Sequence, residues 1–91
     1  MTLFQELIKI FIDIDDPDEM ASFFQEIFTP NEIEDISLRW QLLKELHEGQ
    51  TQRSIATRHG MSLCKITRGS KVLKRGNSIA KKILDTIKET K

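Results

Sequence analysis

The chain has 91 residues, which allows one domain with a small core, because small folds bury a smaller fraction of their surface. Its 14 Lys and Arg equal its 14 Asp and Glu in number, so the formal net charge is zero. The single cysteine, Cys64, excludes a disulfide framework within the chain and leaves no Cys/His cluster for a metal. We therefore expect a protein of the reducing cytoplasm that binds no metal.

Two amphipathic helices are predicted at the start of the chain and separate near Asp16 and Pro17. The charged residues Glu6, Lys9 and Asp13 interrupt the first apolar run, so we expect neither a signal peptide nor a membrane span. The apolar residues that recur at helical spacing are Leu3, Phe4, Leu7, Ile8, Phe11 and Ile12, then Met20, Phe23, Phe24, Ile27 and Phe28.

Four further helices are predicted after these two. The third begins at a capping box in which Thr29 is the N-cap, Pro30 the first helical residue and Glu32 the reciprocal partner, and it ends at Gly49. Short helices follow at about 51–58, 63–73 and 78–89. No alternating strand pattern is present, so the predicted fold class is all-α. The apolar stripe predicted for the third helix consists of Ile33, Ile36, Trp40, Leu43 and Leu46.

Aromatic residues lie on the same helical stripes as Leu and Ile, so we expect the five Phe and the Trp in a core. Nearly every predicted helix has a wide apolar face, which is unusual in so short a chain. An intertwined homodimer would bury these faces. The alternative is a compact six-helix monomer.

Charge is divided sharply along the chain. Residues 1–48 contain 3 basic and 12 acidic residues, and residues 49–91 contain 11 basic and 2 acidic, which gives −9 and +9. The basic residues are densest in KITRGSKVLKR, residues 65–75, where five of eleven are Lys or Arg. Such asymmetry favours a nucleic-acid surface in the second half; the alternative is a solvated charged face.

A helix-turn-helix unit is predicted at about residues 52–74. Ala56 is small enough for two helices to cross, Gly60 can adopt the positive φ of the turn, and Ser62 can cap the second helix. The second helix offers cationic, hydroxyl and apolar groups suited to base edges in a major groove. An ordinary helical hairpin is the alternative. The predicted core residues of the unit are Ile55, Met61 and Ile66.

The segments FTPNEIEDISLRW, KELHEG, QRS and above all ITRGSKVLK resemble the Trp repressor family, over about residues 28–74. This resemblance implies an intertwined homodimer, a single domain over residues 1–91, and L-tryptophan as corepressor. Arg39 and Arg68 would lie against the two faces of the indole ring, Arg68 would also pair with the carboxylate, and Gly69 would leave room for the ring. The ligand's ammonium would be held by backbone carbonyls of the other subunit at Ile27, Phe28 and Thr29.

The resemblance also implies a palindromic double-stranded operator as partner. The DNA contacts it implies are Gln52, Arg53, Leu63, Cys64, Lys65 and Thr67, with Lys74 on phosphate. Two other functions remain open, a ligand-independent helix-turn-helix module and a helical protein-interaction adaptor. An enzyme is not expected, because neither His47 nor His59 lies in a nucleophilic or acid–base arrangement.

Overall fold

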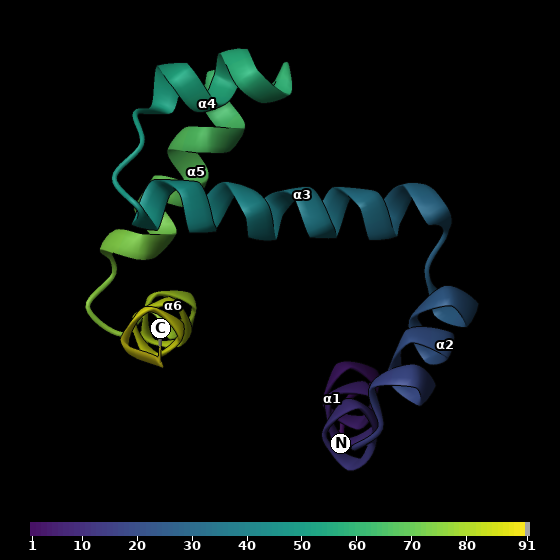
Figure 1. Ribbon diagram of the computed structural model, residues 1–91. Helices are drawn as coiled ribbons and strands as arrows, with labels where there is room; N and C mark the ends of the chain where they lie inside the picture. Colours follow the sequence, from purple (N-terminus) through teal and green to yellow (C-terminus); the bar gives the residue numbers. More distant parts are fainter. Residues whose placement is uncertain (91) are drawn as a thin grey trace. The chain divides into compact units, whose positions relative to one another are not determined.

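A computed structural model describes residues 1–90, with side chains described as far as residue 88 (Figure 1). The described part contains six helices and no strand, as the all-α prediction requires. The helices are α1 (Leu3–Asp13), α2 (Pro17–Ile27), α3 (Pro30–His47), α4 (Gln52–His59), α5 (Leu63–Lys74) and α6 (Ile79–Thr90). The chain divides within α3 into two compact units, an N-terminal unit of residues 1–35 and a C-terminal unit from residue 36 onward. The single domain over residues 1–91 stays a prediction.

Side-chain caps determine where the first three helices begin. Thr2 and Gln5 form a capping box at α1, and the Asp16 side chain accepts from the Glu19 amide at α2, with Pro17 as the first helical residue. The capping box predicted for α3 is confirmed. The Glu32 amide donates to Thr29 Oγ1 at 3.2 Å, and the Thr29 amide donates to Glu32 Oε1 at 2.9 Å.

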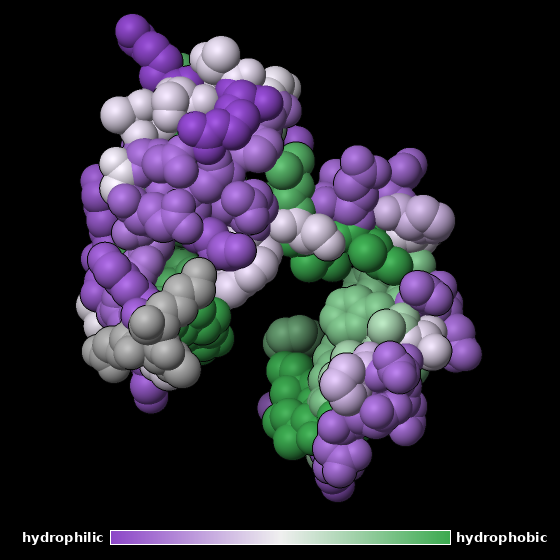
Figure 2. Space-filling view, viewed as in Figure 1, coloured by the Kyte–Doolittle hydropathy of each residue, from purple (hydrophilic) through white to green (hydrophobic). Residues whose placement is uncertain are grey.

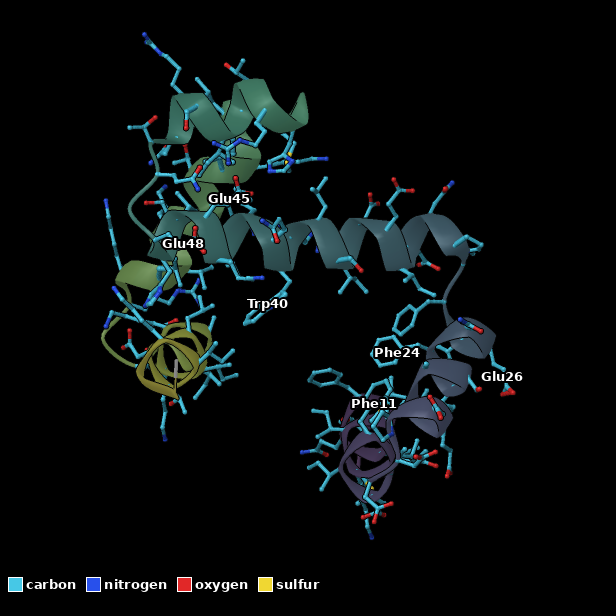
Figure 3. All side chains as sticks on the ribbon, in the orientation of Figure 1. Phe11, Phe24, Glu26, Trp40, Glu45 and Glu48 are labelled. Atoms are coloured by element: carbon cyan, nitrogen blue, oxygen red, sulfur yellow. The ribbon has the colours of Figure 1, made fainter. Side chains whose placement is uncertain are left out.

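In the N-terminal unit, α1 and α2 pack through phenylalanine rings (Figure 3). Phe11 stacks on Phe24 with 5.2 Å between centroids and meets Phe23 edge-on at 5.5 Å, both favourable aromatic geometries. Neither helix contains a buried residue. Phe4, expected in a core, is 70% exposed. This unit therefore has aromatic contacts but no closed core of its own.

The C-terminal unit contains a small closed core. Leu42 of α3, Ile55 of α4 and Ile66 of α5 are buried together, and Leu46, Ala56 and Met61 pack against them. The predicted inward positions of Ile55, Met61 and Ile66 are thus confirmed. This core positions α4 and α5 against the end of α3.

Helix α6 is tied to the end of α3 by a polar contact. His47 Nε2 lies 2.6 Å from Asp85 Oδ1, and Lys81 Nζ donates to the other oxygen of Asp85 at 3.0 Å. Leu84, on the adjoining face of α6, is 5% exposed. Three isoleucines of the same helix remain exposed in the single chain: Ile79, Ile83 and Ile87.

Two predictions, one for α3 and one for α5, are wrong. The stripe predicted for α3 omitted Leu42, which is 3% exposed, and included Trp40, which is 36% exposed. One side of α3 faces α4 and α5. Figure 3 shows that Trp40 does not lie on that side. Ser62 stands at the N-cap of α5 with extended backbone but makes no side-chain cap bond. Because Ser62 is exposed, water can pair with the first amides instead.

Apolar and polar surfaces are unevenly distributed. Figure 2 shows hydrophobic residues gathered on one side of α1 and α2, beside hydrophilic ones, and mainly hydrophilic residues over α4 and α5. Within the described residues, no helix combines the length and apolar character that crossing a membrane requires.

Candidate functional site

A tight turn at residues 60–62 joins α4 to α5. Gly60 ends α4 in the left-handed region, at φ 62° and ψ 35°, where a side chain would be strained. The Met61 amide then donates to the Ala56 carbonyl at 3.1 Å, which closes the end of α4. The predicted need for positive φ at Gly60 is confirmed, and the turn brings α4 and α5 into contact.

Most of the residues predicted to contact DNA are exposed on these two helices. Gln52 and Thr67 are half-buried, and Thr67 Oγ1 donates to Gln52 Oε1 at 3.2 Å, so the first residue of α4 is held against α5. The exposed members of the predicted set are Arg53, Leu63, Cys64, Lys65 and Lys74.

A hollow of about 300 Å³ lies between α3 and α5, within the C-terminal unit. That volume is at the small end of the range of ligand pockets, so it suits one ring system. Arg39, Arg68 and Gly69 were predicted as ligand residues although they lie up to 30 positions apart in the sequence, and all three line the hollow. The remaining lining residues are Leu42, Leu43, Met61, Lys65 and Val72. The hollow is therefore apolar with a few cationic groups.

Gly69 is buried at the crossing of α5 over α3. A Cβ at this position would lie 3.2 Å from Leu46 Cδ1 and 3.5 Å from the side chains of Leu42 and Leu43. The missing side chain therefore brings α5 close to the leucines of α3, besides lining the hollow.

The cations of the hollow have no acidic partner in the described structure. Arg39, Lys65 and Arg68 form no ion pair or hydrogen bond there, and no Asp or Glu lines the hollow. Elsewhere in the same unit, Arg58 pairs with Glu45 and Lys81 pairs with Asp85. Uncompensated cations around an apolar hollow favour a ligand with an anionic group.

A buried carboxylate joins α3 to α4. Glu45 is 2% exposed, and its oxygens accept from Arg58 and from Gln41, while His59 Nε2 lies 2.6 Å from Oε2. Burial raises the pKa of Glu45, but the hydrogen bonds of His59 and Gln41 and the charges of His59 and Arg58 outweigh it. The net pKa therefore lies below the ordinary value, and Glu45 is a carboxylate at neutral pH.

Sequence reasoning missed this ion pair. Glu45 follows Leu42 by three residues, which places it on the same side of α3, but no spacing connects it to residues 13 and 14 positions later. Figure 3 shows Glu45 on the side of α3 that faces α4. Only the packing of the two helices brings the partners together.

The residues predicted to hold the ligand's ammonium belong to the N-terminal unit. Ile27 ends α2, Phe28 follows it with its amide donating to the Phe24 carbonyl, and Thr29 caps α3. The structure describes one chain, so their role toward another subunit stays a prediction. Among the described residues, no group of three His, Cys, Asp or Glu could hold a metal ion.

A small helical chain with a basic helix pair joined by a tight glycine turn has the features of DNA-binding regulators. Comparison with protein families identifies the group. The family model described as Trp repressor protein matches residues 2–88, and the chain belongs to this family. The family consists of DNA-binding regulators and not of enzymes, which confirms that the chain is not an enzyme.

Individual relatives cover most of the chain. It is 33% identical over 85 residues to the uncharacterized protein YerC of Bacillus subtilis, a match that covers 93% of this chain and 82% of YerC. It is 37% identical over 75 residues to a Trp operon repressor homolog of Xylella fastidiosa, covering 81% and 82%. A Trp operon repressor homolog of Chlamydia trachomatis is 35% identical over 71 residues, covering 72% and 76%. No solved structure matches the chain significantly.

Proposed function

We propose that this protein is an L-tryptophan-dependent transcriptional repressor that acts as an intertwined homodimer on a palindromic operator. The observation that carries the proposal is the hollow between α3 and α5, because Arg39 and Arg68 both line this mostly apolar space of about 300 Å³. Family membership supports the assignment as a DNA-binding regulator. The hollow supports the proposal that L-tryptophan is its ligand.

In the proposed complex, the indole ring lies between the guanidinium groups of Arg39 and Arg68, which stack well on aromatic faces. Arg68 also pairs with the carboxylate, and Gly69 leaves space for the ring. The ammonium is held by backbone carbonyls of the other subunit at Ile27, Phe28 and Thr29. Carbonyls at the end of a helix such as α2 have the negative polarity that this contact requires.

The ligand acts as a gate because its two arginines belong to different helices. Arg39 lies on α3, and Arg68 lies on α5 of the DNA-reading pair. A ring held between them favours one position of α5 against α3. A ligand shifts such an equilibrium only if it binds the DNA-competent position more tightly than the alternatives.

In the proposed complex with DNA, α5 enters the major groove and α4 lies across the backbone. Gln52, Arg53, Leu63, Cys64 and Thr67 face the bases and the nearby backbone, and Lys74 contacts phosphate. Lys65 also lines the hollow, so it lies at the boundary between the proposed DNA-binding surface and the ligand site. Dimeric helix-turn-helix proteins, Trp repressor among them, bind half-sites about one helical turn or roughly 34 Å apart, and we expect that spacing here.

The dimer is supported by the apolar surface of the single chain. Phe4 and Ile12 of α1 are 70% and 74% exposed, and α6 exposes Ile79 at 68%. Apolar faces on helices at both ends of a short chain are typical of a subunit interface. This surface is also the observation that favours the second candidate function, a helical protein-interaction adaptor.

The decisive experiment measures DNA affinity with and without L-tryptophan. Duplexes are first selected from a random-sequence pool in the presence of L-tryptophan, and the enriched duplex is then titrated with wild type, Arg39→Ala and Arg68→Ala. Tryptophan should tighten wild-type binding by about tenfold or more, and both variants should reduce that factor. Arg68→Ala should lose more, because it removes the carboxylate pairing as well as one face of the ring.

Arg75→Ala provides the control. Arg75 is exposed at the end of α5 and does not line the hollow, so its removal should leave tryptophan binding unchanged. If saturating tryptophan leaves wild-type DNA affinity unchanged, the protein is better described as a ligand-independent helix-turn-helix module. If no duplex is enriched at all, the adaptor becomes the better account.

A further inference from the structure

Helix α5 has two different polar faces, and Lys65 lies on the one that faces the hollow. Lys65, Arg68, Gly69 and Val72 are spaced i, i+3, i+4 and i+7, which places them on one side of the helix, and all four line the hollow. Lys74 is nine residues from Lys65, or about two and a half turns, and therefore points to the opposite side. Periodicity thus separates Lys65 from the phosphate-facing part of α5.

Lys65 and Arg68 are neighbours on the helix surface. Side chains three residues apart on a helix have Cβ atoms about 5–6 Å apart, so one carboxylate with two oxygens can contact both. Neither side chain has an ion-pair partner among the described residues. The other polar side chain of the lining, Arg39, belongs to α3.

We propose that Lys65 is a specificity-determining residue of the hollow, where its ammonium and the Arg68 guanidinium together bind the anionic group of the ligand. The assignment rests on the proposed function, since it concerns the same ligand site. It deepens that function by adding a second cation, Lys65, to the end of the hollow where the carboxylate of the ligand binds. Ligands of the same shape that lack the negative charge bind more weakly.

The physical reason is the balance of charge. Three cations surround a mostly apolar space without a carboxylate. A ligand whose carboxylate is replaced by a neutral amide keeps its ring contacts but brings only the positive ammonium, which these cations repel. Lys65 should therefore strengthen binding of the acid and weaken binding of the amide.

The test is calorimetry on the DNA-free protein with two probes, L-tryptophan and L-tryptophanamide, for wild type and Lys65→Gln. Lys65→Gln should weaken L-tryptophan binding about tenfold and should leave L-tryptophanamide binding unchanged or tighter. Lys71→Gln is the matched control, because Lys71 is exposed on the same helix, carries the same charge and does not line the hollow. It should change L-tryptophan affinity less than twofold, on the order of the effect of an exposed, screened charge.

The possible outcomes separate the two proposals. If wild type binds L-tryptophan but Lys65→Gln and Lys71→Gln change its affinity equally, Lys65 has no role in the hollow and this inference is wrong, while the proposed function stands. Equal weakening of acid and amide by Lys65→Gln also overturns it, because the effect is then not on the carboxylate. If wild type binds neither probe, the ligand part of the proposed function fails first.

Discussion

The two units of the chain differ in how much apolar surface they bury and in the sign of their charge. The N-terminal unit, residues 1–35, has 10 acidic residues and 1 basic residue, and its first two helices have ring contacts but no buried residue. From residue 36 onward there are 4 acidic and 13 basic residues, and three helices share a closed core of Leu42, Ile55 and Ile66. The first unit leaves much of its apolar surface exposed in the single chain, and the second encloses a small core under a charged surface.

The two units also use polar groups in different places. In the N-terminal unit they cap helices at the surface, as Thr2, Asp16 and Thr29 do. In the C-terminal unit a carboxylate is buried beside the core and joins two helices. A buried charge requires hydrogen-bonding partners, and Glu45 has Gln41 on its own helix and Arg58 and His59 on α4.

The largest expected effect concerns dimerisation. It tests whether a second copy of the chain buries the exposed apolar surface of the N-terminal unit. Phe4→Ala should weaken dimerisation by about 1.5 kcal/mol for each protomer, or on the order of a hundredfold in the dissociation constant of the dimer. The reason is that Phe4 is 70% exposed in one chain and gains burial only from a partner. Sedimentation equilibrium over a range of concentrations measures this change.

Gln25→Ala, on the exposed surface of α2, is the control and should leave the dissociation constant nearly unchanged. A wild-type protein that sediments as a folded monomer at micromolar concentration would contradict the dimer and leave the adaptor as the explanation of the apolar surface.

The next effect tests the buried carboxylate of the C-terminal unit. Glu45→Ala should lower the free energy of unfolding by about 2 kcal/mol, since it leaves Gln41 and the half-buried His59 without their partner. Arg58 is half exposed and contributes less, because water can solvate it. Urea denaturation measures the change, with the exposed Glu48→Ala as control, expected within about 0.5 kcal/mol of wild type. Equal effects for both variants would mean that Glu45 is not the link between α3 and α4.

A smaller effect is the acid dependence of the same unit. The pKa of Glu45 lies below its ordinary value of 4.5, and the hydrogen bond of His47 holds the pKa of Asp85 below 3.8. Both carboxylates therefore add stability that is fully present above their ordinary pKa values and is lost as pH falls through the lowered ones.

Wild type should accordingly lose more stability than Glu45→Gln between about pH 6 and about pH 3, because the amide does not titrate in that window. Urea midpoints at a series of pH values measure this difference. Parallel curves for the two proteins would show that Glu45 has the same pKa in the folded and unfolded states.

The smallest effect concerns two glycines of the α4–α5 pair, Gly60 at the end of α4 and Gly69 within α5. Gly69→Ala should change the free energy of unfolding by less than about 1 kcal/mol, because the helix gains propensity while the end of the Leu46 side chain must yield at 3.2 Å. Gly60→Ala should cost about 1–2 kcal/mol, since φ is 62° there although space is open. Thermal or urea unfolding measures the free energy of unfolding of both variants. A larger loss of stability for Gly69→Ala than for Gly60→Ala would mean that the packing of α5 on α3 cannot adjust to the added methyl group.

The sequence by itself determined the local features of this protein. The helices at 3–13, 17–27 and 30–47, the capping box of Thr29 and Glu32, and the turn at Gly60 all depend on residues within a few positions of one another. Local propensity, capping and backbone freedom act over that distance, so periodicity and spacing suffice to predict them. The quoted segments were also enough to identify the family, which the comparisons confirm.

Only the tertiary structure decided which residues of α3 are enclosed and which groups meet across helices. Leu42 is in the core and Trp40 is not, and Glu45 contacts Arg58 and His59. Both results depend on how α3 is rotated about its axis relative to α4 and α5. The convergence of Arg39, Lys65 and Arg68 on one hollow was decided in the same way, although the resemblance had predicted the two arginines. A helix pattern shows that a face is apolar, but the contacts of each side chain follow from the packing of elements distant in the sequence.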